Sequence, residues 1–184
     1  QKSHNFQLAP ADVPAALWAD REFVRLALGH SPSLLQHAAE HLRDDASLCI
    51  LARSDSDCLK HCSARLQDDR DFVLACIETA ANNLRYASAR LRRDPAVVIS
   101  AIKTYNYNTR YADPSLFSNR AVALQMVQAN GDTLESLSEA LRDDDEIVHT
   151  AIATGLNVYR HVSPRLQAST AVLFVSGIHL QKVW

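Results

Sequence analysis

Three side chains with metal-binding or nucleophilic chemistry lie within five residues of each other. Cys58, His61 and Cys62 are spaced i, i+3 and i+4, so on a helix they share one face and could begin a zinc site. A cysteine beside a histidine can also act as a nucleophile, but the sequence offers no orienting third group and no oxyanion hole. An enzyme using Cys58, His61 or His161 is therefore a minor alternative. The opposing interpretation makes Cys49, Cys62 and Cys76 small core residues, and we expect no metal, no cofactor and no catalytic residue.

Basic and aromatic side chains gather between Glu78 and Asp113, where Asp94 is the only acidic residue. Together they can hold phosphate or stack bases, and they also anchor protein interfaces. A solvated face that happens to be basic is the alternative. The formal net charge of -2 argues against broad nucleic-acid binding. The candidate binding residues are Arg85, Tyr86, Arg90, Arg92, Tyr105, Tyr107, Arg110 and Tyr111.

These residues belong to a repeat. Helix-capping residues recur at intervals of 25, 24, 25, 25, 25 and 25, and a leucine stands three residues before each one. Apolar residues follow each start at spacings of 3, 4 and 7, which is one face of an α-helix. The starts are Asp20, Asp45, Asp69, Asp94, Asn119, Asp144 and Ser169.

A second apolar set closes each copy, as in Leu84, Ala87 and Leu91. Its helical spacing predicts a second helix, so each copy should be two helices of about nine or ten residues that are stable only when stacked. The predicted fold is all-α, an α-solenoid of tandem helix-pair repeats in a single array. Its parts are a partial copy 1–19, full copies 20–44, 45–68, 69–93, 94–118, 119–143 and 144–168 (copies 1 to 6), and a partial copy 169–184.

Two further columns repeat along the array. A ring stands eight residues before most starts, and His37, His61 and His161 are the histidines of this secondary binding ladder. Such rings line peptide grooves, although a ring that packs edge-on and keeps its polar tip wet is the favoured alternative. Arginines stand two residues before alternate starts, and we expect them at a solvated edge, pairing with Asp44, Asp68 or Asp143. They are Arg43, Arg92 and Arg142.

The bulk composition is that of an ordinary folded protein. Apolar residues make up 47% of the 184 residues and charged residues 22%, and no apolar run has the length of a membrane span. Four cysteines are too few for a disulfide scaffold, so we expect a reducing environment. Because the chain starts at Gln1, we expect it to be a piece of a longer protein.

Copy 3 shows the repeated pattern of capping and apolar residues most clearly, with Asp69 to Ala75 followed by Leu84-Arg85-Tyr86-Ala87-Ser88. From about residue 13 onward the chain resembles a bacterial helical-repeat domain of unknown function, whose units read "DREFVLAAVKQNG…LEYASEEL". That family is common in effector proteins of intracellular bacteria, and it offers no catalytic residues to carry over. The resemblance implies a bacterial protein secreted into the host cytoplasm.

We therefore expect a protein-interaction or scaffold module that binds a host protein or positions an adjacent domain of the same chain. Nucleic-acid or phosphate-group binding through the basic, tyrosine-rich stretch of copies 3 and 4 is the alternative. Copy 4 departs from the repeat with Thr109 in place of Leu and Asp113 in place of Ser. Departures without an evident packing gain are expected at functional sites, so we expect partner contacts to concentrate on copies 3 and 4.

Overall fold

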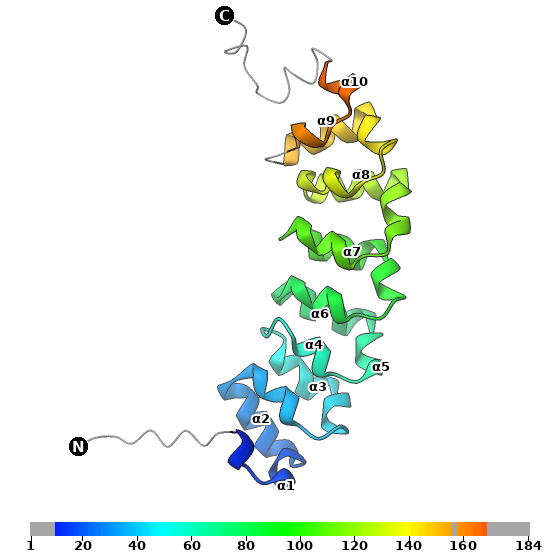
Figure 1. Ribbon diagram of the computed structural model, residues 1–184. Helices are drawn as coiled ribbons and strands as arrows, with labels where there is room; N and C mark the ends of the chain where they lie inside the picture. Colours follow the sequence, from blue (N-terminus) through cyan, green and yellow to red (C-terminus); the bar gives the residue numbers. More distant parts are fainter. Residues whose placement is uncertain (1–9, 156–157, 169–184) are drawn as a thin grey trace, which may run out of the picture. The chain divides into compact units, whose positions relative to one another are not determined.

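The computed structural model describes residues 10–155 and 158–168, and within these ranges the regular structure is helical, with no strand (Figure 1). The all-α prediction is confirmed. No described helix is long and apolar enough to cross a membrane.

The first helix of each copy begins where the capping residues predict. Asp20 accepts a hydrogen bond from the backbone N–H of Phe23, and Asp69 accepts one from that of Phe72. Each carboxylate satisfies a donor that the first helical turn leaves free. The seventh start, Ser169, lies outside the described residues. These helices are α2 (Arg21–His30), α3 (Ala46–Cys49) continued by η4 (Ile50–Ala52), α6 (Arg70–Thr79), α7 (Pro95–Ile102), α8 (Arg120–Ala129) and α9 (Asp145–Thr154).

The prediction of one continuous second helix is wrong. The chain forms a short helix, then passes through extended backbone, such as Ala87 with φ -64° and ψ 152°, and then starts another turn. The apolar spacing of three fits a 3₁₀-helix, whose side chains at i and i+3 eclipse, as well as it fits an α-helix. The residue after the break caps the new turn: Ser63 Oγ, for example, accepts from the backbone N–H of Leu66.

The short helices before the break are η2 (Pro32–His37), α4 (Cys58–His61), η5 (Ala81–Tyr86), η7 (Asn106–Tyr111), η9 (Gly131–Ser136) and η11 (Tyr159–His161). Those after it are η3 (Leu42–Asp44), α5 (Ala64–Gln67), η6 (Leu91–Arg93), η8 (Pro114–Ser118), η10 (Leu141–Asp143) and α10 (Pro164–Gln167). Before copy 1 stand η1 (Pro10–Asp12) and α1 (Ala15–Trp18).

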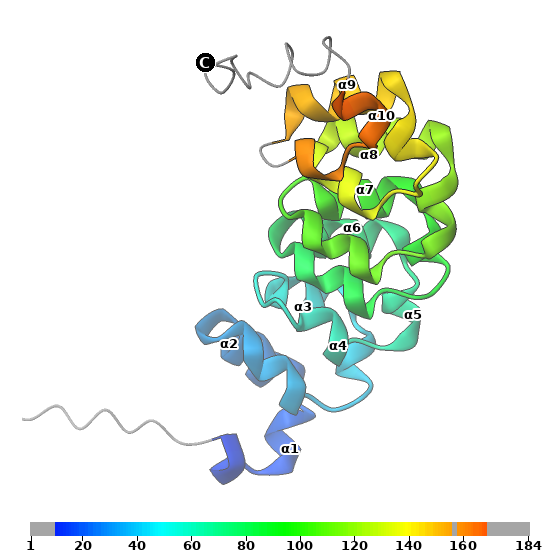
Figure 2. The same cartoon turned by 45° about the horizontal axis from the view of Figure 1, so that its top comes forward.

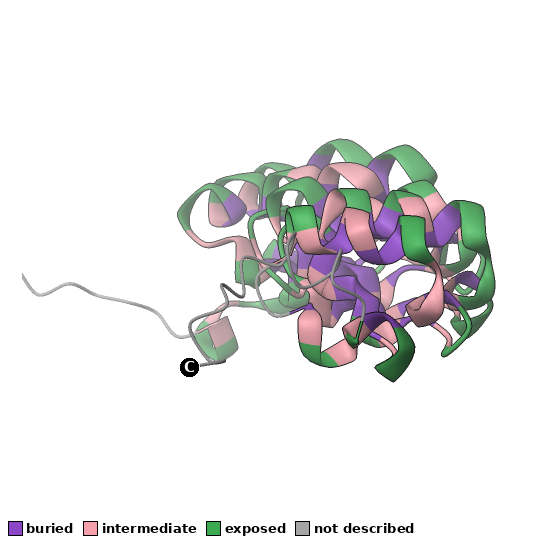
Figure 3. Ribbon diagram, turned by 90° about the horizontal axis from the view of Figure 1, so that it is seen from above, coloured by how far each residue is buried: buried purple, intermediate pink, exposed green. Residues whose placement is uncertain are grey.

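The leucine column forms the core, as predicted. From copy 1 to copy 6 the leucine before each next start is at most 8% exposed, and only Leu17, before copy 1, is as much as 40% exposed. Buried residues line the inner side of each helix and exposed ones the outer side (Figure 3). The buried leucines are Leu42, Leu66, Leu91, Leu116, Leu141 and Leu166.

The chain packs as two units, Gln1–Ser88 (unit 1) and Ala89–Trp184 (unit 2). Within unit 2, α7, α8 and α9 follow one another side by side (Figure 2). In each unit, a backbone hydrogen bond links the residue after the break to the preceding copy. In unit 1 Ser63 N–H donates to Arg43 O at 2.9 Å, and in unit 2 Asp113 N–H donates to Arg92 O at 2.9 Å and Ser163 N–H to Arg142 O at 3.1 Å.

Candidate functional site

Four of the predicted binding residues form one surface cluster in unit 2. Tyr105 precedes η7, and Tyr107, Arg110 and Tyr111 belong to it. The rings of Tyr105 and Tyr107 lie 5.4 Å apart, and the Arg110 guanidinium lies 5.0 Å from the Tyr107 ring and 5.8 Å from the Tyr111 ring. Because i and i+3 eclipse in a 3₁₀-helix, Tyr107 and Arg110 share one side of η7. We call these four residues the tyrosine cluster.

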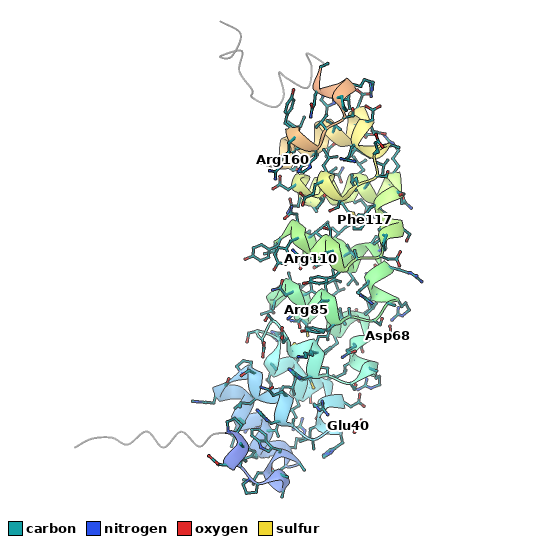
Figure 4. The ribbon with its side chains drawn as sticks, in the orientation of Figure 1. Glu40, Asp68, Arg85, Arg110, Phe117 and Arg160 are labelled. Carbon is teal, nitrogen blue, oxygen red and sulfur yellow. The ribbon has the colours of Figure 1, made fainter. Side chains whose placement is uncertain are left out.

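The tyrosine cluster combines one exposed ring with two half-buried rings and an arginine held by a hydrogen bond. The Tyr105 side chain is 54% exposed, whereas Tyr107 and Tyr111 are half-buried. Arg110 is exposed (Figure 4), and its Nε donates to the backbone oxygen of Tyr107 at 2.9 Å, which holds the guanidinium against the rings. Cation–π contacts of this kind contribute about 0.5–1 kcal/mol at exposed sites. The side chains are thus ordered before any partner arrives.

Arg85 and Tyr86 form a separate pair at the end of η5 in unit 1. The Arg85 guanidinium lies 4.5 Å from the Tyr86 ring and forms an ion pair with Asp57. Burial raises the pKa of Asp57, but the hydrogen bond and charge of Arg85 outweigh it, so the pKa lies below its usual value. The positive charge that the sequence placed here without compensation is therefore neutralised by an acid from the preceding copy.

The remaining two predicted residues differ from each other. Arg90 is exposed, whereas Arg92 is half-buried with its Nε fully covered. Both belong to unit 2, and no contact described for them joins the tyrosine cluster. The eight candidates thus comprise the tyrosine cluster, the Arg85–Tyr86 pair, exposed Arg90 and half-buried Arg92.

The departures of copy 4 have packing reasons, which corrects their interpretation as functional marks. Thr109 is buried and accepts a hydrogen bond from Ser136 Oγ at 2.9 Å. Asp113 lies 2.6 Å from the Nε of Arg93. Hydrogen bonds from Ser115 and then from Arg93 lower its pKa to about 2.

The Arg93–Asp113 pair takes the place of a serine–aspartate hydrogen bond that other copies make at the same positions. Elsewhere a serine after the break donates to an aspartate just before the start of its copy, as Ser63 does to Asp44 and Ser163 to Asp143. In copy 4 an arginine replaces the aspartate and an aspartate replaces the serine. The polar contact across the copy is kept.

The three histidines of the predicted ladder have different surroundings. His37 is exposed and its ring lies 5.2 Å from that of Trp18. Burial and then the charge of Lys60 lower the pKa of His61. His161 accepts from the Nε of Arg160 at 2.9 Å, so the same ring nitrogen, 3.4 Å from Glu135, does not also donate to that carboxylate. No common role follows from these environments.

The four cysteines form a buried thiol cluster in unit 1. All are reduced and buried, and the sulfurs of Cys58 and Cys76 lie 3.6 Å apart. The hydrogen bond with Cys76 and burial raise the pKa of the Cys58 thiol, and contact with Cys49 and burial raise that of Cys62. A protonated buried thiol is a poor nucleophile. The described residues contain no group of three or more side chains placed to hold a metal ion.

The arginines two residues before alternate starts are more buried than the solvated edge expected for them. Arg43, Arg92 and Arg142 are half-buried, and each Nε is covered and has no hydrogen-bond partner among the described residues. The expected pairing with nearby aspartates is wrong. Serines take those carboxylates instead, and Arg65 and Arg165 add ion pairs of 3.0 and 2.9 Å to Asp44 and Asp143.

Comparison with known families returns one match. Residues 50–92 and 69–117 match a domain of unknown function (DUF4116), so two overlapping stretches cover most of copies 2 to 4. The matched region contains the Arg85–Tyr86 pair and the tyrosine cluster. No curated protein and no solved structure matches the sequence significantly.

Proposed function

We propose that the chain is an α-solenoid that serves as a protein-interaction module, with the tyrosine cluster as its principal contact surface. The short helices recur once per copy, and a backbone hydrogen bond joins neighbouring copies at the same point within each unit. Stacked repeats of this kind expose a long surface on which side chains of the same column line up. The family resemblance adds the setting that we propose, a bacterial effector that acts on a host protein.

The exposed ring of Tyr105, beside two half-buried rings that Arg110 contacts, carries this proposal. Tyrosine offers a large contact area at a low entropy cost, because it has only two rotatable side-chain bonds. Here Arg110 already contacts two of the rings, so little further conformational freedom is lost on binding. Tyrosine and arginine are also the residue types enriched at energetic hot spots of protein interfaces.

Charge pairing favours a protein partner over a nucleic acid. Asp57 neutralises Arg85 and Asp113 neutralises Arg93, and Asn106 beside the cluster donates to the carboxylate of Glu135 at 3.1 Å. A polyphosphate backbone needs a continuous basic surface, which these carboxylates interrupt. A nucleic-acid ligand remains the second candidate, and a steep salt dependence of its binding is the distinguishing result.

A photo-crosslinking residue placed at Tyr107 tests the proposal against one placed at Gln125, which is exposed on α8 of the same unit. We expect a defined crosslinked protein from host-cell lysate only with the Tyr107 probe. Once that protein is purified, the double change Tyr105→Ala with Tyr107→Ala should weaken its binding more than about tenfold, which corresponds to over about 1.4 kcal/mol and is typical of a tyrosine hot spot. The thermal midpoint should stay nearly unchanged.

The matched control is Gln125→Ala with Gln128→Ala, which removes two exposed side chains from α8. Equal losses from the two double variants would show that the tyrosine cluster is not the contact surface. Loss of binding on changing His37 and His161 alone would move the surface to the histidine ladder.

A further inference from the structure

Three arginines occupy the same place in alternate copies, each directly after a buried leucine of the core. They are Arg43 in η3 of unit 1, and Arg92 in η6 and Arg142 in η10 of unit 2. In all three the Nε is covered from solvent and has no hydrogen-bond partner among the described residues. A covered donor without a partner is energetically unfavourable, so hydrogen bonding among the described residues does not explain why arginine stands at these places.

Other arginines of the array are paired, which sets these three apart. Arg65 pairs with Asp44, Arg93 with Asp113, and Arg165 with Asp143. Arg120 on α8 contacts both Asp144 and Glu146, at 2.8 and 2.7 Å. No ion pair or side-chain hydrogen bond is described for Arg43, Arg92 or Arg142. The Nε atoms are covered, so only the terminal guanidinium nitrogens of these arginines can take an anion from outside.

Two other copies carry glutamine in place of this arginine, and the contacts of the two residue types can be compared. Copies 2 and 6 carry Gln67 and Gln167 there. Gln67 Nε2 donates to Leu59 O and Cys62 O at 3.0 and 3.2 Å, and Gln167 Nε2 donates in the same way to Tyr159 O and Val162 O. The arginine Nε stands at the same position along its side chain as the glutamine Nε2, yet it has no partner among the described residues, so the three arginines do not make these carbonyl contacts.

The backbone fixes these arginines in position. The carbonyl oxygens of Arg43, Arg92 and Arg142 each accept the hydrogen bond that links their copy to the next one. The backbone at these places is therefore held, and the planar fork of a guanidinium matches a carboxylate with two parallel hydrogen bonds.

We propose that Arg92 and Arg142 bind carboxylates of an extended acidic peptide along unit 2. The inference rests on the proposed function, whose partner class it names. The two arginines lie two copies apart, so one ligand that reaches both must be a chain with spaced charges. Glu135, between them in sequence, approaches both Asn106 of η7 and His161 of η11. A peptide can place a neutral residue beside Glu135, whereas a polyphosphate cannot.

Fluorescence anisotropy with the whole chain tests this assignment. The probe is a labelled peptide of alternating Glu and Ser. The same peptide with Gln for Glu and a single-stranded oligothymidylate of equal length are the comparisons. We expect the Glu peptide to bind, the Gln peptide not to bind, and the oligothymidylate to bind more weakly than the Glu peptide. Stronger oligothymidylate binding, or no binding of the Glu peptide, overturns the proposal.

The variants are Arg92→Gln and Arg142→Gln, because glutamine already stands at the equivalent place in two copies and the fold should accept it. Each should weaken Glu-peptide binding about tenfold, the effect of losing one charge-assisted hydrogen bond, with an unchanged thermal midpoint. Arg120→Gln is the control: it removes the same charge from a paired, exposed arginine and should change affinity less than about twofold.

An equal loss from Arg120→Gln would mean that only net charge attracts the peptide, and would overturn the site. The crosslinking experiment at Tyr107 is independent of these arginines. If the protein crosslinked at Tyr107 still binds the Gln variants but not the tyrosine double variant, the acidic-peptide site is wrong. The proposal of a protein-interaction module is then still supported.

Discussion

Asn83 ties copies 2 and 3 together inside unit 1, and its replacement by alanine is the sharpest test of how the copies are stacked. Its side chain is fully buried on η5. Oδ1 accepts from the backbone N–H of Leu59 at 3.1 Å, and Nδ2 donates to Asp55 O at 3.0 Å and to Ala80 O at 3.1 Å. Asn83→Ala removes all three hydrogen bonds.

Of the three partners of the Asn83 side chain, the backbone N–H of Leu59 is the one left without a hydrogen bond. Asp55 O keeps a hydrogen bond from Cys58 N–H, and Ala80 O keeps one from the backbone N–H of Asn83. The Leu59 N–H has no other described acceptor, and an unsatisfied buried donor costs about 1–3 kcal/mol. Adding part of the net contribution of the other two hydrogen bonds, we expect Asn83→Ala to lower the free energy of unfolding by about 2–4 kcal/mol.

Hydrogen exchange of the Leu59 amide is the most direct assay, because repeat proteins open locally and need not unfold in one step. The expected change corresponds to exchange that is faster by about 30-fold to about 900-fold. Asn106→Ala is the matched control, since its side-chain hydrogen bond to Glu135 is exposed and should contribute under about 1 kcal/mol. A Leu59 amide that stays protected in Asn83→Ala would refute the assigned stacking of copies 2 and 3.

Four further outcomes are expected. Leu91→Ala should cost about 2–5 kcal/mol in urea unfolding, because Leu91 is fully buried, whereas exposed Arg25→Ala should stay within about 0.5 kcal/mol; similar values would contradict the leucine column. Gly131→Ala should cost about 1–3 kcal/mol, because the added Cβ would overlap the carbonyl oxygen of Ala151, and an unchanged thermal midpoint would argue against that close approach. Hydrogen bonds from Ser47 and then Arg21 lower the pKa of Asp45 to about 2. The ionised carboxylate therefore stabilises the folded state at any pH above its unfolded-state pKa, and this contribution is lost as the carboxylate is protonated. The free energy of unfolding should fall between about pH 4 and pH 2, and less steeply in Asp45→Asn. The four thiols should react with a disulfide reagent only after denaturation, and purified protein should carry no stoichiometric zinc; fast native reaction, or zinc lost in Cys58→Ser, would contradict the buried thiol cluster.

Much of the local structure follows from residues that are close in the sequence. Asp69 caps α6 because its carboxylate needs only the backbone three residues ahead, and Leu66 is buried because each copy repeats the same apolar spacing. The position of each first helix and the identity of its core residues were therefore predictable. The break after η5 was not, because a spacing of three does not distinguish a 3₁₀-turn from an α-turn.

Which side chains meet on the surface depends partly on the tertiary structure. The tyrosine cluster could be found in the sequence because all of its members lie within seven residues. Asp57 and Arg85 are 28 residues apart, and only stacking of one copy on the next joins them.

The same stacking decides which arginines are free. Nothing in the spacing of Arg92 and Arg93 shows that the second meets Asp113 while the first is covered and left without a partner. A period of about 25 residues determines that copies repeat, but which side chains meet across them depends on how closely their backbones approach.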